Sequence, residues 1–254
     1  GIANQYPNIA GIKPLKENGS KFLKAFLDID IPDRCIVPTV GSMQGTFTLF
    51  ILLSQRIPGK DTVLFLDPGF PAQHHQAKLL GLKQESLDVY DCRGEALEAR
   101  LEQALSKGNI TAILYSNPNN PAWFNFTSVE HEIIGRMADK YDAIVLEDHA
   151  YLGMDFRQRY GVPYTAPFVP TVAKYTKNCI LLVSASKIFS YAGQRIAMAV
   201  SYTHLTLPRS TTASMRPSAR STTCPPSATH TYSACSTAPR RAWPIRPSMA
   251  SPRC

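Results

Sequence analysis

Short apolar runs alternate with helical segments through residues 1–200, and this alternation restricts the fold more than any other feature. Apolar or β-rich runs occupy residues 34–40, 61–67, 87–90, 110–115, 143–146, 179–183 and 196–200. Helical patterns occupy residues 41–55, 73–80, 95–106 and 127–140. Apolar strands separated by such helices indicate a mostly parallel sheet covered on both faces. The sequence therefore predicts an α/β three-layer sandwich over residues 34–200, preceded by an N-terminal segment at residues 1–33.

The character of the sequence changes abruptly at Ser201. Residues 201–254 contain ten serines, eight prolines and no glycine, without apolar periodicity. Prolines exclude long helices and central strands, and this composition buries too little surface to offset its conformational entropy. We expect a low-complexity Ser/Pro/Arg tail that is either disordered or not native sequence, because residues 201–208 resemble translated sequencing-adapter sequence. A basic arm that binds an acidic partner is the alternative interpretation.

The net charge of +8 belongs almost entirely to the tail. Residues 201–254 carry seven arginines and no acidic residue, whereas residues 1–200 carry 20 basic and 19 acidic residues. A nearly neutral domain argues against nucleic-acid binding. The six cysteines form no CxxC pair, which favours free thiols in a reducing cytoplasm. The apolar runs are too short to span a bilayer and no signal peptide is present, but the chain begins at Gly1, so processing or truncation there stays open.

Lys187 lies just after one of the predicted strands. The run at residues 179–183 leads into Ser184-Ala185-Ser186-Lys187, and Arg195 follows. Desolvation readily lowers the pKa of a lysine, so an amine at the end of a buried strand can be a neutral nucleophile. Ser184 and Arg195 would donate hydrogen bonds to a phosphate. These residue types predict a Schiff base beside a phosphate, as in pyridoxal 5'-phosphate (PLP) enzymes. Taken alone, the motif fits a surface lysine equally well.

Two further groups of polar residues follow predicted strands. Residues 116–120 follow the strand at 110–115, and Asp148 follows the strand at 143–146. Ligands of such sheets bind outside the carboxyl ends of the strands. We therefore expect these residues and Lys187 to meet at one edge of the sheet.

Several motifs occur in the order found in a known enzyme family. Gly41-Ser42-Met43-Gln44-Gly45 is similar to a phosphate-binding turn, where a helix N-terminus offers free N–H groups and a favourable dipole. The later motifs are Asp67-Pro68-Gly69-Phe70, Asn117-Pro118-Asn119-Asn120-Pro121, Glu147-Asp148-His149-Ala150-Tyr151 and the lysine segment. Over residues 1–200 the chain resembles the large domain of class I/II aminotransferases, which are PLP enzymes of fold type I.

The resemblance implies a PLP site with one role for each matching residue. Its members would be Tyr6, Ser42, Met43, Phe70, Asn120, Asp148, Tyr151, Ser184, Lys187 and Arg195. Lys187 would hold the cofactor and act as the general acid/base. Asp148 would keep the pyridine nitrogen protonated, and Phe70 would stack on the ring.

The remaining members would bind the polar groups of PLP. Asn120 and Tyr151 would hydrogen-bond its phenolic oxygen. Ser42, Ser184 and Arg195 would anchor its phosphate. No metal is assigned, because His74, His75 and His149 have no ligand-spaced partners.

Two segments qualify the resemblance. Gln5-Tyr6-Pro7-Asn8-Ile9-Ala10-Gly11 resembles the segment whose tyrosine reaches the phosphate of the neighbouring subunit, so Tyr6 implies a homodimer in the intact parent. Ala122-Trp123 stands where the family has Thr-Gly, which predicts a different path for the loop after Pro121.

The resemblance implies a cytoplasmic aminotransferase that moves an amino group from an amino acid to a 2-keto acid by a ping-pong Schiff-base mechanism. Nothing in residues 201–254 resembles the family's small domain or the arginine that pairs with the substrate carboxylate. We therefore expect the 254-residue chain to be a fragment with weak activity or none. The shared residues equally allow a C–S lyase, a decarboxylase or a synthase of the same fold, or a PLP-sensing regulatory module.

Overall fold

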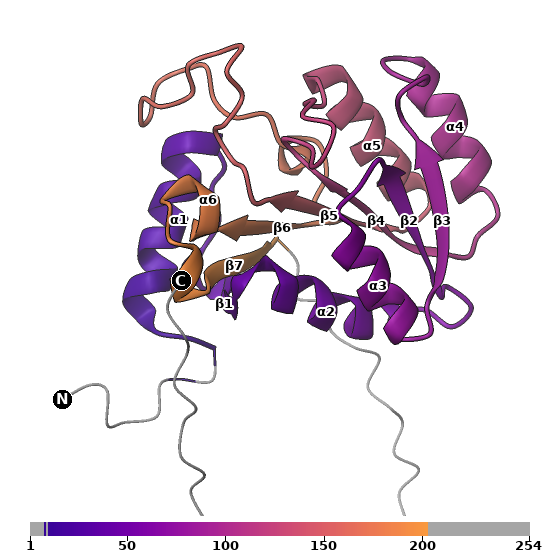
Figure 1. The fold of residues 1–254 in the computed structure, drawn as a ribbon, viewed down its shortest axis with the longest axis horizontal. Coiled ribbons are helices and arrows are strands. Elements are labelled where there is room, and N and C mark those ends of the chain that lie inside the picture. The colour runs from indigo at the N-terminus through magenta and orange to yellow at the C-terminus, as the bar shows by residue number, and fades with distance from the viewer. Residues whose placement is uncertain (1–7, 9, 203–254) are drawn as a thin grey trace, which may run out of the picture. The chain divides into compact units, whose positions relative to one another are not determined.

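A single sheet of seven strands organises the protein, whose computed structural model describes residues 8 and 10–202 (Figure 1). Its order is β1-β7-β6-β5-β4-β2-β3. The strands are β1 (Ile36–Val40), β2 (Thr62–Asp67), β3 (Lys83–Asp88), β4 (Ile110–Ser116), β5 (Ile144–His149), β6 (Cys179–Ser184) and β7 (Ile196–Ser201). Strand β7 is antiparallel to β1 and β6, and all other neighbours are parallel. The prediction of a mostly parallel α/β sheet is confirmed.

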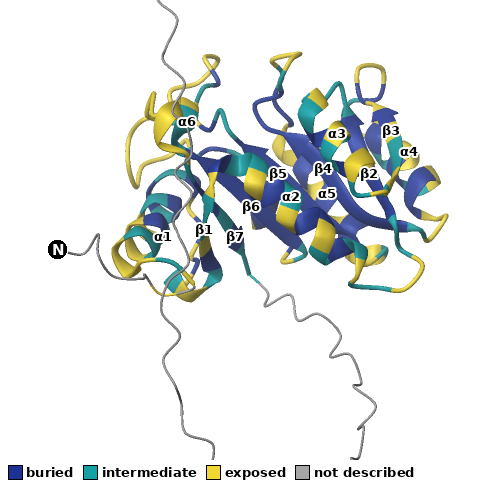
Figure 2. Ribbon diagram, turned by 60° about the horizontal axis from the view of Figure 1, so that its bottom comes forward, coloured by how far each residue is buried: buried dark blue, intermediate teal, exposed yellow. Residues whose placement is uncertain are grey.

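Helices cover both faces of this sheet (Figures 1 and 2). The helices are α1 (Lys13–Leu27), α2 (Gly41–Ser54), α3 (Pro71–Leu79), α4 (Ala96–Leu105), α5 (Ser128–Lys140) and the single turn α6 (Ala185–Ile188). Short 3-10 turns are η2 (Asp33–Cys35), η3 (Val172–Lys174) and η4 (Ala192–Gln194). Buried side chains of α2 and α3 pack on one face, and those of α1, α4 and α5 pack on the other. This arrangement is the predicted three-layer sandwich.

The central strands are buried along their whole length, which explains why their apolar runs are easy to recognise. Every residue of β4, β5 and β6 is buried. The edge strand β3 has the polar sequence KQESLD, and it begins four residues before the strand predicted at 87–90. A strand at the edge of a sheet has fewer neighbours to pack against, so its sequence carries a weaker apolar signal.

Helix α5 begins with a capping box, at the start of the helical pattern predicted for residues 127–140. Thr127 Oγ1 accepts a hydrogen bond from Glu130 N over 3.2 Å, and Glu130 Oε2 accepts from Thr127 N over 2.8 Å. This reciprocal pair satisfies two N–H groups that the first helical turn leaves without partners. Over the residues that the structure describes, no helix combines the length and the apolar character needed to cross a membrane.

The register of the central strands sends neighbouring carboxylates to opposite faces. In the β4–β5 pair, Tyr115 lies beside Glu147 and Ser116 beside Asp148. Successive side chains of a strand alternate between the faces of its sheet. Asp148 therefore shares the α2–α3 face with Leu146, while Glu147 faces the layer of α5.

Candidate active site

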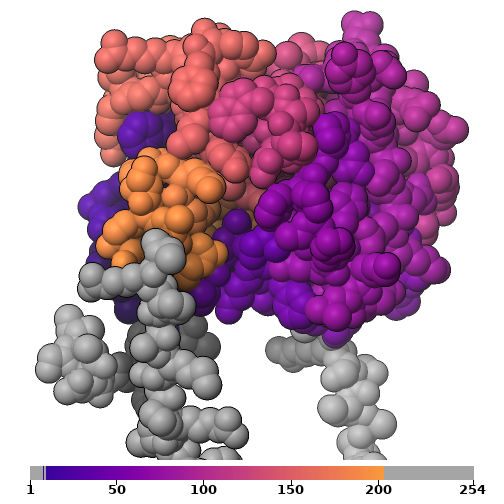
Figure 3. Space-filling view, in the orientation of Figure 1, coloured from indigo at the N-terminus to yellow at the C-terminus, as the bar shows by residue number. Residues whose placement is uncertain are grey.

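A cavity of about 260 Å³ lies at the carboxyl edge of the parallel strands. It is lined by the start of α2, the loop before α3, the loops after β4 and β5, and the segment from β6 to β7. Figure 3 shows two of these segments on one face, with the salmon chain after β5 above the orange chain around α6. The predicted site residues on this cavity are Ser42, Met43, Phe70, Asn120, Asp148, Tyr151, Ser184, Lys187 and Arg195. Tyr6 lies outside the described residues.

The N-terminal end of α2 forms one wall of the cavity. Gly41 has a φ of +72°, and a Cβ atom there would lie 2.2 Å from Nη2 of Arg195. Gly41 N also donates a hydrogen bond to Arg195 O over 3.0 Å. The N-cap residue Val40 provides no side-chain cap, so the N–H groups at Ser42 and Met43 remain available to a ligand. Together with the Arg195 guanidinium group, these donors fit a phosphate dianion.

Two hydroxyl groups extend this donor set. Ser184 is buried, and its Oγ accepts a hydrogen bond from Ser186 N over 3.2 Å. Arg195 Nη1 lies 3.5 Å from Ser186 Oγ and donates to Ala192 O over 2.9 Å. The contact with Ala192 fixes the guanidinium group at the cavity wall. Ser186 was absent from the predicted site, although it lies in the same short motif as Lys187.

Lys187 lies on α6, which begins immediately after β6. The side chain lines the cavity, yet the residue is exposed. The sequence led us to expect an amine desolvated by the end of a buried strand. The described residues do not desolvate it in this way, because β6 ends at Ser184 and the helical turn carries the lysine beyond the sheet edge. Lys187 and Asp148 nevertheless line the same cavity, as a site that uses both residues requires.

Asp148 is the buried carboxylate of the cavity. Its Oδ2 accepts a hydrogen bond from Gln73 Nε2 over 2.8 Å, and its Oδ1 accepts from Ala150 N over 3.1 Å. Burial raises the pKa of Asp148 to about 6, although His149 and these two donors favour the ionised form. A buried carboxylate with a raised pKa is stabilised by a cationic ring N–H, so Asp148 fits a protonated pyridine nitrogen.

Hydrogen bonds hold the loops that carry Phe70 and Asn120 against each other. Asn119 Nδ2 donates to Pro68 O over 2.8 Å, which joins the loop after β4 to the loop after β2. Asn120 N donates to Ser116 Oγ over 3.0 Å. These contacts place an aromatic ring and an amide on the same cavity as Asp148. An apolar ring, an amide, a buried carboxylate and an anion-binding end form a set that fits an aromatic, phosphorylated cofactor.

A buried cluster behind the cavity was missed by the sequence analysis. His131 Nε2 lies 2.9 Å from Glu147 Oε1, and His149 Nε2 lies 3.1 Å from Glu147 Oε2. Thr171 Oγ1 donates to Glu147 Oε2 over 2.6 Å. Burial opposes ionisation of Glu147, but the two histidines outweigh it and hold its pKa well below the ordinary value. Among the described residues, no three His, Cys, Asp or Glu side chains are placed to hold a metal ion.

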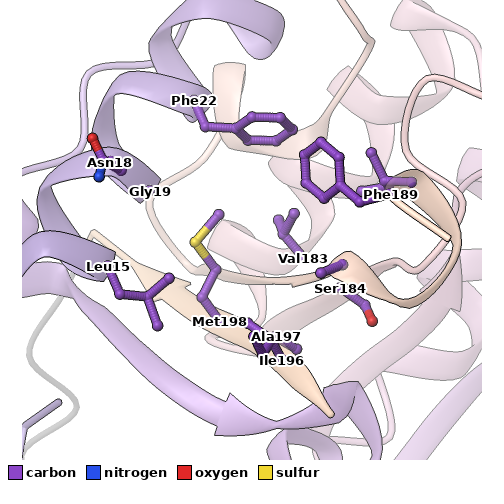
Figure 4. Close-up of a pocket in the computed structure, with 12 residues that line it drawn as sticks. Leu15, Asn18, Gly19, Phe22, Val183, Ser184, Phe189, Ile196, Ala197 and Met198 are labelled. Atoms are coloured by element: carbon purple, nitrogen blue, oxygen red, sulfur yellow. The ribbon is translucent and has the colours of Figure 1, made fainter. Parts of the chain in front are cut away.

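A second, apolar cavity of about 230 Å³ lies behind α6, between α1 and β7 (Figure 4). The rings of Phe22 and Phe189 meet across it with centroids 5.8 Å apart. Met198 and Leu15 line its other side. None of the residues that line it carries an ionisable side chain. This cavity therefore offers packing space and no reactive group.

Comparison with known proteins identifies the family of the chain. The family model described as aminotransferase class I and II matches residues 1–238, a range that extends into the predicted tail. An aspartate aminotransferase of Pyrococcus horikoshii is 27% identical over 201 residues, which cover 79% of this chain and 48% of that protein. A histidinol-phosphate aminotransferase of Chlorobaculum parvum is 29% identical over 197 residues, covering 78% of this chain and 49% of that protein.

Solved structures show the same fold. The N-succinyldiaminopimelate aminotransferase of Mycobacterium tuberculosis superposes with a TM-score of 0.61 at 22% identity, covering 78% of this chain and 50% of that one. At this identity the likeness concerns the fold. The chain spans about half the length of the curated relatives that it matches.

Proposed function

The chain belongs to the class I and II aminotransferase family, and from that premise we propose that it is the cofactor-binding half of a PLP-dependent aminotransferase. The enzyme would move an amino group from an amino acid to a 2-keto acid by a ping-pong mechanism. One observation carries the proposal: residues from five separate segments, singled out from the sequence for PLP, line the same cavity.

The cavity offers a matching group for each part of PLP. The N–H groups of Ser42 and Met43, the Ser184 hydroxyl and the Arg195 guanidinium group would hold the phosphate. Phe70 would lie on the ring. PLP, when bound, would supply an electron sink that stabilises negative charge at the substrate α-carbon.

Lys187 has two tasks in this proposal. Its Nζ would hold the cofactor through the aldehyde carbon, and during turnover it would remove and return the proton at the substrate α-carbon. The exposure of Lys187 leaves its amine accessible from solvent, so the residue can meet a cofactor that enters through the cavity mouth.

Asp148, Asn120 and Tyr151 would set the charge distribution around the ring. The Asp148 carboxylate, oriented by Gln73, would accept a hydrogen bond from the N–H of the protonated pyridine ring. The Asn120 amide and the Tyr151 hydroxyl would donate to the phenolic oxygen. Each of these groups lines the cavity, which supports this assignment.

The intact enzyme is proposed to be a cytoplasmic homodimer, with Tyr6 reaching the phosphate of the neighbouring subunit. The free thiols of Cys35, Cys92 and Cys179 support a reducing compartment. Amino acid and 2-keto acid would be the substrates.

Covalent trapping tests the cofactor assignment. The chain would be incubated with PLP, reduced with borohydride and digested, and the modified peptide identified by mass spectrometry. We expect one modified site, at Lys187, together with a shift in the cofactor absorbance. Lys187→Ala should abolish the trapped product, whereas Lys78→Ala, at an exposed lysine of α3 outside the cavity, should leave it unchanged. Equal trapping by Lys187→Ala and the parent chain would disprove the assignment.

A further inference from the structure

Trp123 holds a backbone conformation that suits glycine. Its φ is +54°, in the left-handed region that bulky side chains rarely adopt. The turn around it is well formed, since Trp123 N donates to Asn119 O over 3.1 Å and Asn119 N donates to Phe124 O over 2.8 Å. Strained conformations that the surrounding structure maintains concentrate at ligand-binding and active sites. The strain therefore suggests that the indole ring has a task at this position.

The indole ring belongs to an exposed aromatic cluster formed by Trp123, Tyr151 and Phe156. Its centroid lies 5.4 Å from the Tyr151 ring in an edge-to-face arrangement and 6.2 Å from the Phe156 ring in a stacked one. Trp123 is 46% exposed and Phe156 is 85% exposed. Two neighbouring rings thus present apolar faces to solvent, as binding surfaces do.

The aromatic cluster is continuous with the candidate active site. Tyr151 lines the cavity beside Lys187 and also contacts Trp123. A group that extends from the reacting centre past Tyr151 would meet the indole ring next. The aromatic cluster therefore adjoins the cavity through the Tyr151 ring.

The cations that line the cavity or directly follow Phe156 in the sequence already have assigned partners or roles. Arg157, the basic residue next to Phe156, already binds Asp155 through Nε over 2.9 Å and through Nη2 over 2.8 Å. Within the cavity the cationic lining residues are Lys187 and Arg195, and the proposed function uses both. An acidic substrate side chain would find no unpaired cation among these groups.

We propose that the aromatic cluster binds the side chain of an aromatic amino acid, or of the corresponding 2-keto acid, as the substrate of this site. The inference rests on the proposed aminotransferase function and specifies its substrate class. A planar ring could pack edge-on or offset against Trp123 and Phe156, which is the preferred geometry for aromatic pairs.

Binding of two amino acids to the PLP-loaded 254-residue chain tests this inference. Titration with L-phenylalanine and L-aspartate would be followed by calorimetry and by cofactor absorbance. We expect phenylalanine to bind about tenfold more tightly than aspartate, a ratio of the size that one aromatic contact provides.

Trp123→Gly is the decisive variant, because glycine suits the left-handed φ and should leave thermal stability equal or higher. It should weaken phenylalanine binding about tenfold and leave aspartate binding unchanged. Trp123→Phe, which keeps an aromatic ring, should retain most of the difference in affinity between phenylalanine and aspartate. Tyr90→Ala removes an aromatic residue that is 81% exposed beyond β3, and it should change neither affinity.

Each outcome separates the inference from the function on which it rests. Loading of PLP at Lys187 without a preference for phenylalanine, or a preference that Trp123→Gly leaves intact, overturns the inference alone. Failure to load PLP at Lys187 overturns the proposed function and the inference together. A changed oligomeric state of Trp123→Gly in light scattering, with unchanged affinities, would assign the cluster to a subunit contact and also overturn the inference.

Discussion

Gln73 donates a hydrogen bond from Nε2 to Oδ2 of Asp148 over 2.8 Å, and both residues are almost fully buried, with 1% and 4% exposure. Helix α3 supplies the amide and strand β5 supplies the carboxylate, so the bond joins a helix of the outer layer to the centre of the sheet. Burial favours the protonated acid and raises the pKa of Asp148 to about 6, while Gln73 favours the carboxylate. Gln73 therefore helps to keep Asp148 ionised near neutral pH.

Gln73→Leu should weaken PLP binding, and more strongly at low pH. Loss of the donor raises the pKa of Asp148 further above about 6, so less carboxylate is present to pair with the ring nitrogen. A hydrogen bond to a charged group contributes about 1.5–3 kcal/mol, or roughly a tenfold to hundredfold change in Kd. The measurement is the Kd for PLP between pH 6 and 8.5. Gln103→Leu, at an exposed glutamine of α4, is the control. An equal loss at every pH would argue against the electrostatic explanation.

Asp148 should make the cofactor-free chain less stable as the pH rises. Its pKa is about 6 in the folded protein against 3.8 in the unfolded chain, so between these pH values the folded state holds a proton that the unfolded state has lost. The free energy of unfolding therefore decreases by about 3 kcal/mol in total as the pH rises through these values. Asp148→Asn should remove the decline. The test is urea unfolding of both proteins from pH 4 to pH 8, and a pH-independent difference between their unfolding free energies would contradict the prediction.

Glu130 should stabilise the fold against acid from a position outside the cavity. Burial opposes its ionisation, but hydrogen bonds from Arg93, Thr127 N and Gly94 N outweigh burial and lower its pKa to about 2. A lowered pKa means that its contribution is present above the unfolded value of 4.5 and is lost as the pH falls towards 2. Glu130→Gln should cost about 3 kcal/mol at pH 7, because it removes the buried carboxylate that pairs with Arg93.

The control for Glu130 is an exposed ion pair of the same charges. Glu98 binds Arg136 over 2.7 Å on the surface between α4 and α5. Exposed pairs contribute little to stability, so Glu98→Gln should leave the urea midpoint almost unchanged. Similar losses in both variants would show that the buried network around Glu130 has no special role.

Local sequence signals were sufficient for the elements at the centre of the fold. The runs that became β4 and β6 are mostly apolar segments, and the Thr127–Glu130 spacing marks a helix start without tertiary information. The cavity was predictable because parallel strands end at one edge, where polar residues such as Asp148 and Lys187 then gather. Chain topology alone brings such residues together.

Other features depend on contacts that no local pattern encodes. Helix α1 was not predicted, and Gly19 in its middle is a poor helix former. A Cβ at Gly19 would lie 2.9 Å from Met198 Sδ, so any larger residue at this position would require the Met198 side chain to shift. The role of Gln73 follows from a partner 75 positions away in the sequence. Likewise, the buried pair of His131 and Glu147 exists only once α5 has packed on the sheet.

The 254-residue chain should load PLP but turn over amino donors slowly. Arg195 is the only arginine among the described residues that line the cavity, and the proposed function assigns it to the phosphate. An arginine that pairs bidentately with the substrate carboxylate would have to come from elsewhere, and the loss of such a pair costs about 2–5 kcal/mol. The measurement is transfer of the amino group from a panel of amino acids to 2-oxoglutarate. Turnover at about 10 s⁻¹, typical of enzymes, would contradict this expectation.

Gly41→Ala should impair the phosphate end of the cavity specifically. A Cβ at residue 41 would meet Arg195 Nη2 at 2.2 Å, so the guanidinium group must move, and the φ of +72° adds backbone strain. Gly81→Ala is a matched control, because Gly81 has a φ of +73° with no atom within 4 Å of the added Cβ. Both variants should lose about 1–2 kcal/mol of stability, since both force alanine into the left-handed region. Only Gly41→Ala should also weaken PLP binding, by about tenfold or more through the displaced charge-assisted hydrogen bonds. Equal PLP affinities for the two variants, measured at a temperature where both are folded, would remove Arg195 from the proposed phosphate site.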